Sequence, residues 1–379
     1  MGIVGDHMRV VHLTTISSSL EYLLKTELLY QQAAGCKVVG MSAPGPSAKR
    51  LEGLGIQHVA IRGLSRRWSP SGDFRALTSL VRELRRIRPD VLHTHTPKAG
   101  VLGRFAGRLA RVPVVGNTCH GLWAPPNGGR AGYLLALVAE GVAAQLSDFE
   151  LYQNEEDFRR MAPLVRRARR AVVGNGVDLD LFKFSPHGRE EVRAELGIAA
   201  DEVCVGSVGR QVAEKGLLEF ASTAGMLSGK ARFLWIGAPD LEKWDAVTSQ
   251  LPNLMYLGHR DDMPSVYSAL DVFVLASYRE GLSRSAMEAA ACGRALVLSN
   301  IRGCREIGEH GKEVLLVPPK DVLALSEAVG RLVVDRDYCA RLGAAARARA
   351  ERAFDQKAVA QLSLAAYRDS AVARLGQPT

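Results

Sequence analysis

The chain has 379 residues, of which 47% are hydrophobic and 23% are charged. This length exceeds that of one typical hydrophobic core, and the composition excludes a largely disordered chain, so we expect roughly two domains. The net charge of +9 is unevenly spread, because residues 1–176 hold 24 Lys/Arg against 13 Asp/Glu, a balance of +11, while the remainder carries −2.

The basic first half is compatible with nucleic acid, an anionic membrane or a phosphorylated small molecule as partner. Aromatic residues make up only 6% of the chain and do not alternate with the basic ones, so we predict no nucleic-acid partner. Peripheral contact with a membrane through this half stays open as an alternative.

The six cysteines are scattered without a C-x-x-C pair, which indicates reduced thiols in a cytoplasmic protein and spells out no metal site. Residues 1–7 include an acid and lack an apolar core, so they do not resemble a signal peptide, and Met8 is a candidate natural start. No run of eighteen apolar residues is present, so we expect no membrane span.

From Met8 onwards, short apolar runs alternate with helical patterns, as in a parallel sheet covered by helices on both faces. The expected elements of the first half are 9–13, 20–34, 37–41, 90–93, 100–110 and 112–116. The turn at 14–19 lacks a glycine fingerprint, so a dinucleotide site is not supported there. Its hydroxyls fit either a cap for the following helix or a contact to phosphate or acceptor.

Three histidines lie where strands of the first half are expected to end. For His93 and His95 we favour packing over metal binding, because no third ligand stands at a supporting spacing. His120 follows the next strand, at the sheet edge where α/β proteins bind ligands, which favours a contact with the substrate. The Pro/Gly loop 124–130 would suit a lid over an acceptor. The basic run 164–170 fits a phosphorylated surface and a solvated helix end equally well.

Residues 172–180 close the first sheet and lead into a linker at 182–186. The D-x-D pairs at 178–180 and 335–337 are common by chance, and we assign metal to neither. In the second half, a strand at 203–208 is followed by Gly209, Arg210 and Lys215. A glycine that admits a ligand to the backbone and two converging cations are suited to a diphosphate.

A strand at 271–276 precedes Glu280, and a helix from Ser285 carries Glu288. We expect the amides of Gly281, Leu282 and Ser283 to open that helix without intrahelical partners and to attract an anion. The two carboxylates would flank these donors and accept from sugar and ribose hydroxyls. Further strands are expected at 233–237, 254–258, 295–299 and 313–318, with a helical tail over 321–373.

Taken together, these residues resemble the GT-B glycosyltransferases, specifically glycosyltransferase family four. The resemblance covers nearly the whole chain and is densest in Gly206-x-x-Gly-Arg210-x4-Lys215-Gly, Glu280-Gly-Leu-x5-Glu288-Ala and Gly303-Cys-Arg-Glu306. The run His93–Gly103 and the segment Thr118-x-His120-Gly are similar to a bacterial subgroup that builds surface polysaccharides and lipid-linked glycans.

The resemblance implies two Rossmann-like domains facing across a cleft: 1–176 for the acceptor, 177–355 for the nucleotide sugar, and a helix at 356–379 crossing back to the first domain. It implies a retaining transferase that needs neither metal nor cofactor. Glu280 would then hold the donor sugar, Glu288 the ribose, Arg210 and Lys215 the diphosphate, and His120 the sugar from the opposite wall.

The sequence departs from the family pattern at two loops. Ser17–Ser19 replace the frequent Gly-Gly of the first loop, and Ser283 replaces the proline common after Glu-Gly-Leu. From the motifs and the resemblance together, we predict a retaining, metal-independent hexosyltransferase. Its donor would be a nucleotide-diphospho-sugar, and its acceptor a glycan, a lipid-linked sugar or a small molecule. The alternatives are a sugar-nucleotide 2-epimerase on the same scaffold and a non-enzymatic basic protein that binds membrane or nucleic acid.

Overall fold

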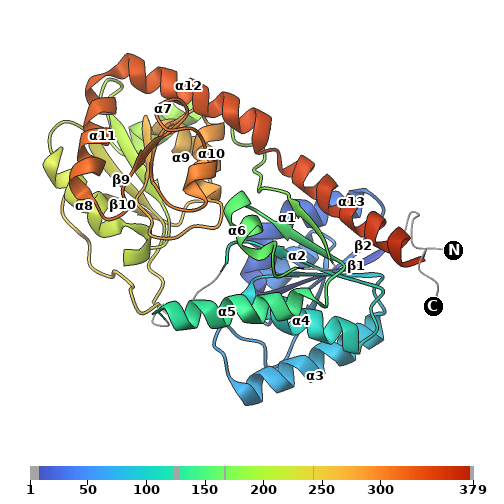
Figure 1. Ribbon diagram of the computed structural model, residues 1–379. Helices are drawn as coiled ribbons and strands as arrows, with labels where there is room; N and C mark the ends of the chain where they lie inside the picture. The colour runs from blue at the N-terminus through green and yellow to red at the C-terminus, as the bar shows by residue number, and fades with distance from the viewer. Residues whose placement is uncertain (1–7, 123–128, 166–167, 242, 376–379) are drawn as a thin grey trace. The chain divides into compact units, whose positions relative to one another are not determined.

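The computed structural model describes residues 8–122, 129–165, 168–241 and 243–375. The chain divides into two compact units, one of Met1–Gly174 together with Gln356–Thr379 and one of Asn175–Asp355 (Figure 1). Each unit is a parallel sheet with helices on both faces. The α/β class with two parallel-sheet domains, predicted from the alternation of apolar runs and helical patterns, is therefore confirmed.

The first unit contains a seven-stranded parallel sheet in the order β3-β2-β1-β4-β5-β6-β7. Its strands are β1 (Arg9–Ile16), β2 (Lys37–Ala43), β3 (Gln57–Ala60), β4 (Val91–His95), β5 (Val114–Cys119), β6 (Phe149–Tyr152) and β7 (Arg169–Val172). The central strands are buried along nearly their whole length, which fits the apolar residues in their first halves, and the polar residues near their carboxyl ends are buried as well. The chain leaves β1 towards β3 on one side and resumes at β4 on the other, so the ligand edge is expected beyond the ends of β1 and β4.

Helices on the two faces of this sheet bury separate apolar clusters. One face is covered by α1 (Ser17–Ala33), α2 (Ser47–Gly53) and α13 (Gln356–Leu375), and the other by α3 (Pro70–Ile87) and α4 (Pro97–Leu109). A third cluster involves α5 (Gly129–Ala144) and α6 (Glu155–Met161). The last helix, drawn in red, lies beside α1 (Figure 1), so residues from opposite ends of the sequence share one core.

The second unit contains a six-stranded parallel sheet in the order β10-β9-β8-β11-β12-β13. Its strands are β8 (Cys204–Val208), β9 (Arg232–Ile236), β10 (Met255–Gly258), β11 (Val272–Leu275), β12 (Ala295–Ser299) and β13 (Leu315–Val317). The helices are α7 (Pro186–Glu195), α8 (Leu217–Met226), α9 (Met263–Ala269), α10 (Arg284–Ala291), α11 (Val322–Val334) and α12 (Arg336–Ala353), with 3-10 turns η1 (Ala213–Lys215) and η2 (Cys304–Glu306). The order reverses between β8 and β11, which places the ligand edge beyond these two strands.

At two places in the first unit, the structure contradicts one of the two alternatives that the sequence left open. The helix expected from Leu20 begins at Ser17, and its N-cap is Ile16, an apolar side chain that cannot cap, because β1 continues to that residue. The Thr15 hydroxyl instead lies 2.8 Å from that of Thr96. The end of the basic run 164–170 is not a helix end either: Arg169 begins strand β7 and lies 2.6 Å from Asp369 of α13.

Among the residues that the structure describes, no helix combines the length and the apolar character needed to cross a membrane. The loop predicted as an acceptor lid at 124–130 lies outside the described residues, except for the first residues of α5. Arg166 and Arg167 of the basic run also lie outside them.

Candidate functional site

The loops that follow β8 and β11 lie at the edge of the second sheet where α/β proteins generally bind their ligands. The two strands are neighbours, with Val205 opposite Val272, so their carboxyl ends lie side by side. The loop after β8 carries Gly209, Arg210 and Lys215, and the loop after β11 carries Glu280. The sheet order therefore brings together residues that stand 65 positions apart in the sequence.

Lys215 and Glu280 form an ion pair across these loops. The Lys215 ammonium lies 2.6 Å from Glu280 Oε1, and the side chains are only 19% and 12% exposed. A partly buried pair is less screened by water than a surface pair, so each charge is held in place by the other. An anionic ligand at this edge would meet an ammonium that is already oriented.

Neighbouring contacts hold the same two loops together. The Arg279 guanidinium lies 2.7 Å from Glu214, and the backbone amide of Tyr278 donates to the carbonyl oxygen of Glu214 at 2.9 Å. Gly216 has a φ of +74°, and a Cβ there would lie 2.2 Å from the carbonyl oxygen of Ala276. Only glycine permits this approach of the β8 loop to the β11 loop, which keeps Lys215 within reach of Glu280.

Arg210 is held by an acid that the sequence analysis missed. Its Nη1 lies 2.5 Å from Asp240, in the loop after β9, while the side chain remains 42% exposed. The preceding residue is fixed as well, since the Trp235 indole N–H donates to the carbonyl oxygen of Gly209 at 3.0 Å. An acid in the loop after β9 leaves no pattern in the sequence from which its pairing with Arg210 could be inferred.

Glu288 lies on α10 and is nearly buried. It accepts from Arg284 Nε at 2.9 Å and from the hydroxyl of Tyr267 at 3.0 Å. Burial raises the pKa of Glu288, and the charge of Arg284 opposes this rise. The carboxylate is therefore oriented by two side chains, and its role towards ribose stays a prediction.

The start of α10 differs from the prediction. The helix begins at Arg284, so Gly281, Leu282 and Ser283 do not supply its first amides. Ser283 is the N-cap, and its hydroxyl accepts from the amide of Ala286 at 3.3 Å, while the side chain of Leu282 belongs to the core. Whether the three residues contact a ligand through other groups stays a prediction.

In the first unit, His120 directly follows β5 and lies 3.0 Å, Nε2 to Nδ1, from His95. His95 in turn lies 3.0 Å from His12 of β1. The structure thus adds His12 of β1 beside His93 and His95, and His12 stands 83 residues before His95, where no local spacing could indicate it. Ligand atoms of His12, His93 and His95 lie within 4.8 Å of one another, so the three could in principle hold a metal ion.

The D-x-D pairs have structural roles. The carboxylate of Asp178 accepts from the amides of Asp180 and Leu181 at 3.0 Å in a turn. Asp335 caps α12 by accepting from the amide of Tyr338 at 2.8 Å. Both arrangements are local hydrogen bonds of short acidic side chains with the backbone.

Residues 202–335 match the family description "Glycosyl transferases group 1", and residues 28–176 match "Glycosyl transferase 4-like domain". The chain is 31% identical over 324 residues to an alpha-maltose-1-phosphate synthase of Mycolicibacterium smegmatis, covering 77% of this chain and 83% of that protein. The chain belongs to the GT-B glycosyltransferases of family four. The prediction made from the strand-end motifs is thereby confirmed.

Two other similar proteins bear on the family and the fold. An Escherichia coli UDP-Gal:alpha-D-GlcNAc-diphosphoundecaprenol alpha-1,3-galactosyltransferase is 29% identical over 276 residues, 70% of this chain and 71% of that protein. The crystal structure of Anabaena HepE in complex with UDP-glucose superimposes with a TM-score of 0.80 at 21% identity, covering 95% of this chain and 99% of that one. At 21% identity, the superposition supports the GT-B fold and nothing further.

The chain therefore belongs to a family of enzymes that transfer glycosyl groups. None of the three similar proteins is named an epimerase or a nucleic-acid-binding protein, so the alternatives to transfer are not favoured. A capsular polysaccharide biosynthesis glycosyltransferase of Staphylococcus aureus is 23% identical over 368 residues, 93% of this chain and 95% of that protein.

Proposed function

We propose that the second unit binds a nucleoside-diphosphate sugar with the residues that follow β8 and β11. The Lys215–Glu280 pair carries this proposal, because one ammonium and one carboxylate 2.6 Å apart offer a partner to phosphate and a partner to sugar hydroxyls at one edge. Arg210 and Gly209 would contact the diphosphate, and Glu288 the ribose.

In the proposed reaction the bond between the sugar and the diphosphate breaks, an acceptor hydroxyl bonds to the anomeric carbon and gives up its proton, and the nucleoside diphosphate leaves with the negative charge. Lys215 and Arg210 stabilise that charge, while Glu280 holds the sugar and its developing positive charge. We propose that these cations act in place of a metal ion and that the anomeric configuration is retained, as the family pattern implies. His120 of the first unit is assigned to the donor sugar on the same ground.

A thermal-shift panel with UDP, GDP, ADP and dTDP tests the proposal. We expect one nucleotide to raise the melting temperature of the wild type in a concentration-dependent way, because a ligand that binds only the folded state stabilises it by mass action. Replacement of Lys215 by Met should abolish most of this shift. An equal shift in the Lys215→Met variant would contradict the assignment of the diphosphate site.

We further propose that the acceptor is carried by a polyprenyl diphosphate at a membrane surface. The similar proteins support this: the E. coli enzyme acts on a diphosphoundecaprenol-linked sugar, and a Campylobacter jejuni protein, 27% identical over 84% of this chain, is named a diphospho-undecaprenol N-acetylgalactosaminyltransferase. Helix α5 adds a physical reason, since Leu134, Leu135, Val138 and Val142 of this helix are each at least 50% exposed. Their spacing places them on one face.

Co-sedimentation with anionic vesicles tests the role of this face. We expect the wild type to bind vesicles and the double variant Leu135→Ser, Val138→Ser to bind several-fold more weakly, because each exposed apolar side chain contributes to insertion at the lipid interface. Leu323→Ser is the matched control, since Leu323 is also exposed, at 64%, but lies on α11 of the second unit. Equal loss of binding in both variants would contradict the proposal.

A further inference from the structure

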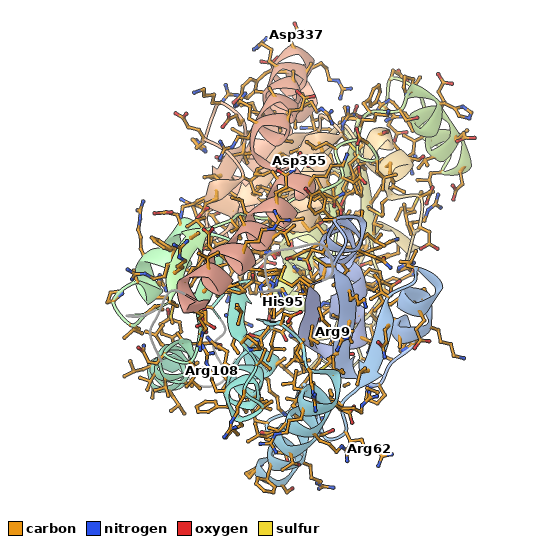
Figure 2. The ribbon with its side chains drawn as sticks, turned by 90° about the vertical axis from the view of Figure 1, so that its right-hand side faces the viewer. Arg9, Arg62, His95, Arg108, Asp337 and Asp355 are labelled. Carbon is orange, nitrogen blue, oxygen red and sulfur yellow. The ribbon has the colours of Figure 1, made fainter. Side chains whose placement is uncertain are left out.

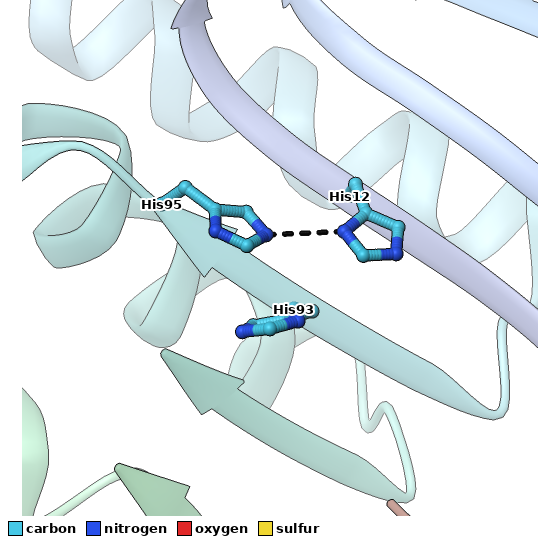
Figure 3. Close-up of side chains that lie close together, drawn as sticks. All are labelled: His12, His93 and His95. Atoms are coloured by element: carbon cyan, nitrogen blue, oxygen red, sulfur yellow. Dashed lines mark hydrogen bonds between the residues drawn. The ribbon is translucent and has the colours of Figure 1, made fainter. Parts of the chain in front are cut away.

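A chain of hydrogen bonds links His120 to the interior of the first unit. His120 Nε2 lies 3.0 Å from His95 Nδ1, His95 Nε2 lies 3.0 Å from His12 Nδ1, and His12 Nε2 lies 2.8 Å from Gln31 Oε1. Figure 3 shows the rings of His95 and His12 edge to edge, and their planes differ by only 14°. His95 is buried within this unit, whereas side chains such as Arg62 project outwards (Figure 2).

Gln31, at the end of the hydrogen-bond chain, determines which nitrogen of each histidine donates. Gln31 Nε2 lies 3.1 Å from Glu27 Oε1 and 3.1 Å from the hydroxyl of Tyr367. A flipped amide would turn its carbonyl oxygen towards the carboxylate, which has no proton to donate when ionised. The amide nitrogen therefore faces Glu27, and Gln31 Oε1, which can only accept, faces His12.

The donor and acceptor nitrogens of each ring then follow from those of the preceding residue. Burial lowers the pKa of His12 to about 4 and that of His95 well below its usual value, so both rings are neutral near pH 8 and carry one N–H each. His12 donates from Nε2 to Gln31, so its Nδ1 must accept from His95 Nε2. The Nδ1 of His95 is then left to accept, and His120 must donate from Nε2.

A metal ion is the competing explanation for three clustered histidines. Both nitrogens of His93 have other partners, since Nδ1 lies 2.5 Å from the hydroxyl of Tyr367 and Nε2 lies 2.7 Å from Thr118 Oγ1. A metal ion would also need an unprotonated nitrogen from each ring. His12 Nδ1 and His95 Nε2 lie 3.0 Å apart, and two unprotonated nitrogens at that distance would not form a hydrogen bond. Every ring nitrogen of His12, His93 and His95 therefore has a hydrogen-bond partner within the protein.

We infer that Gln31, His12 and His95, with Glu27 behind them, are positioning residues that hold His120 in the tautomer with its proton on Nε2. The Nδ1 of His120 then carries no proton and can only accept; the side chain of Gln153 is a further hydrogen-bond partner of His120. The Nε2–H groups of His120, His95 and His12 all point towards Gln31. Their aligned dipoles polarise the His120 ring and make its Nδ1 a stronger hydrogen-bond acceptor. In serine hydrolases, a buried aspartate fixes the tautomer of the catalytic histidine in a similar way. The catalytic meaning of this inference rests on the role proposed above for His120.

Nitrogen-15 NMR of the histidine rings tests the tautomers without any assay of transfer. At pH 8, above the pKa of Glu27, which burial raises to about 7, we expect the Nε2–H tautomer for His12, His95 and His120. The resonances of His120 are identified by their loss in the variant His120→Asn. An Nδ1–H tautomer at His120 in the wild type would overturn the inference, as would a stoichiometric bound metal ion found by elemental analysis.

Two substitutions at Gln31 test the positioning role. Gln31→Met removes the acceptor, so we expect His120 to become a mixture of tautomers and the transfer rate kcat to fall about 10-fold, with the KM for the donor unchanged. Gln31→Glu restores an acceptor for His12 and should recover both signals. Gln32→Met is the matched control, because Gln32 is the next residue on α1 and its exposed side chain donates to the carbonyl oxygen of Gly55 at 3.1 Å.

The two readouts separate the inference from the proposed function. An unchanged His120 tautomer in Gln31→Met would overturn the hydrogen-bond chain, whatever the transfer rate. A changed tautomer with an unchanged rate would instead remove His120 from the reaction and with it the catalytic meaning of the chain. If Gln31→Met fails to fold, the wild-type spectrum alone still decides the tautomer.

Discussion

Replacing Glu280 by Gln is expected to slow glycosyl transfer by about 100-fold or more while leaving the second unit folded. The amide keeps the shape of the side chain but removes the charge that the reacting sugar needs, and loss of one such electrostatic partner typically costs two to three orders of magnitude. Transfer is measured at saturating donor, and folding by circular dichroism and melting temperature.

The same substitution should not weaken nucleotide binding. Lys215 is paired with Glu280 at 2.6 Å, so removing the carboxylate frees the ammonium for a diphosphate. We therefore expect Glu280→Gln to bind the nucleoside diphosphate as tightly as the wild type or more tightly. Glu309→Gln is the control, because Glu309 also pairs with a lysine, Lys312 at 3.1 Å, but both side chains are 68% exposed. Wild-type transfer by Glu280→Gln would exclude its catalytic assignment.

The second large effect is expected on stability, at the buried Arg104 of α4. Its guanidinium lies 2.7 Å from Glu150, also contacts Glu140, and donates through Nε to the carbonyl oxygen of Gly100 at 2.9 Å. Arg104→Met would leave the carboxylate of Glu150 buried without its cation. Breaking a buried pair in this way costs about 3–5 kcal/mol.

This loss should depend on pH. Burial raises the pKa of Glu150, and the charge of Arg104 opposes that rise. Without Arg104 the pKa of folded Glu150 lies further above its value in the unfolded chain. Stability from such a group is lost as pH rises through the folded pKa, so the deficit of Arg104→Met should be largest at alkaline pH and shrink on acidification.

Hydrogen exchange of the amides in α4 and β5 measures this loss locally, which matters because two units need not unfold in one transition. Arg159→Met is the control, since Arg159 pairs with Glu155 at 3.1 Å on the surface of α6. We expect about 0.5 kcal/mol or less from this exposed pair. Equal protection losses in the two variants would contradict the role of the buried network.

The sequence predicts those features of this molecule that depend on local pattern. Apolar runs such as 271–276 and 295–299 become β11 and β12 because strands buried on both faces need continuous apolar residues. Strand ends then place Arg210, Lys215 and Glu280 at one edge, and the Lys215–Glu280 contact follows from the sheet order.

Features that depend on distant parts of the chain could not be predicted. The pairing of Arg210 with Asp240, the packing of Tyr367 against His93, and the alignment of His12 with His93 across β1 and β4 all require the tertiary fold. The start of α10 was misplaced for a different reason: Ser283 is a strong N-cap, and its identity marked the helix boundary more accurately than the helix propensity of the following residues.

The most direct test of the donor site is a calorimetric titration of the nucleoside diphosphate that stabilises the wild type. The account predicts that Lys215→Met and Glu288→Ala each weaken this binding about 10-fold or more, that Glu280→Gln does not weaken it, and that Glu309→Gln binds like the wild type. Wild-type affinity in both Lys215→Met and Glu288→Ala would contradict the assignment of the site.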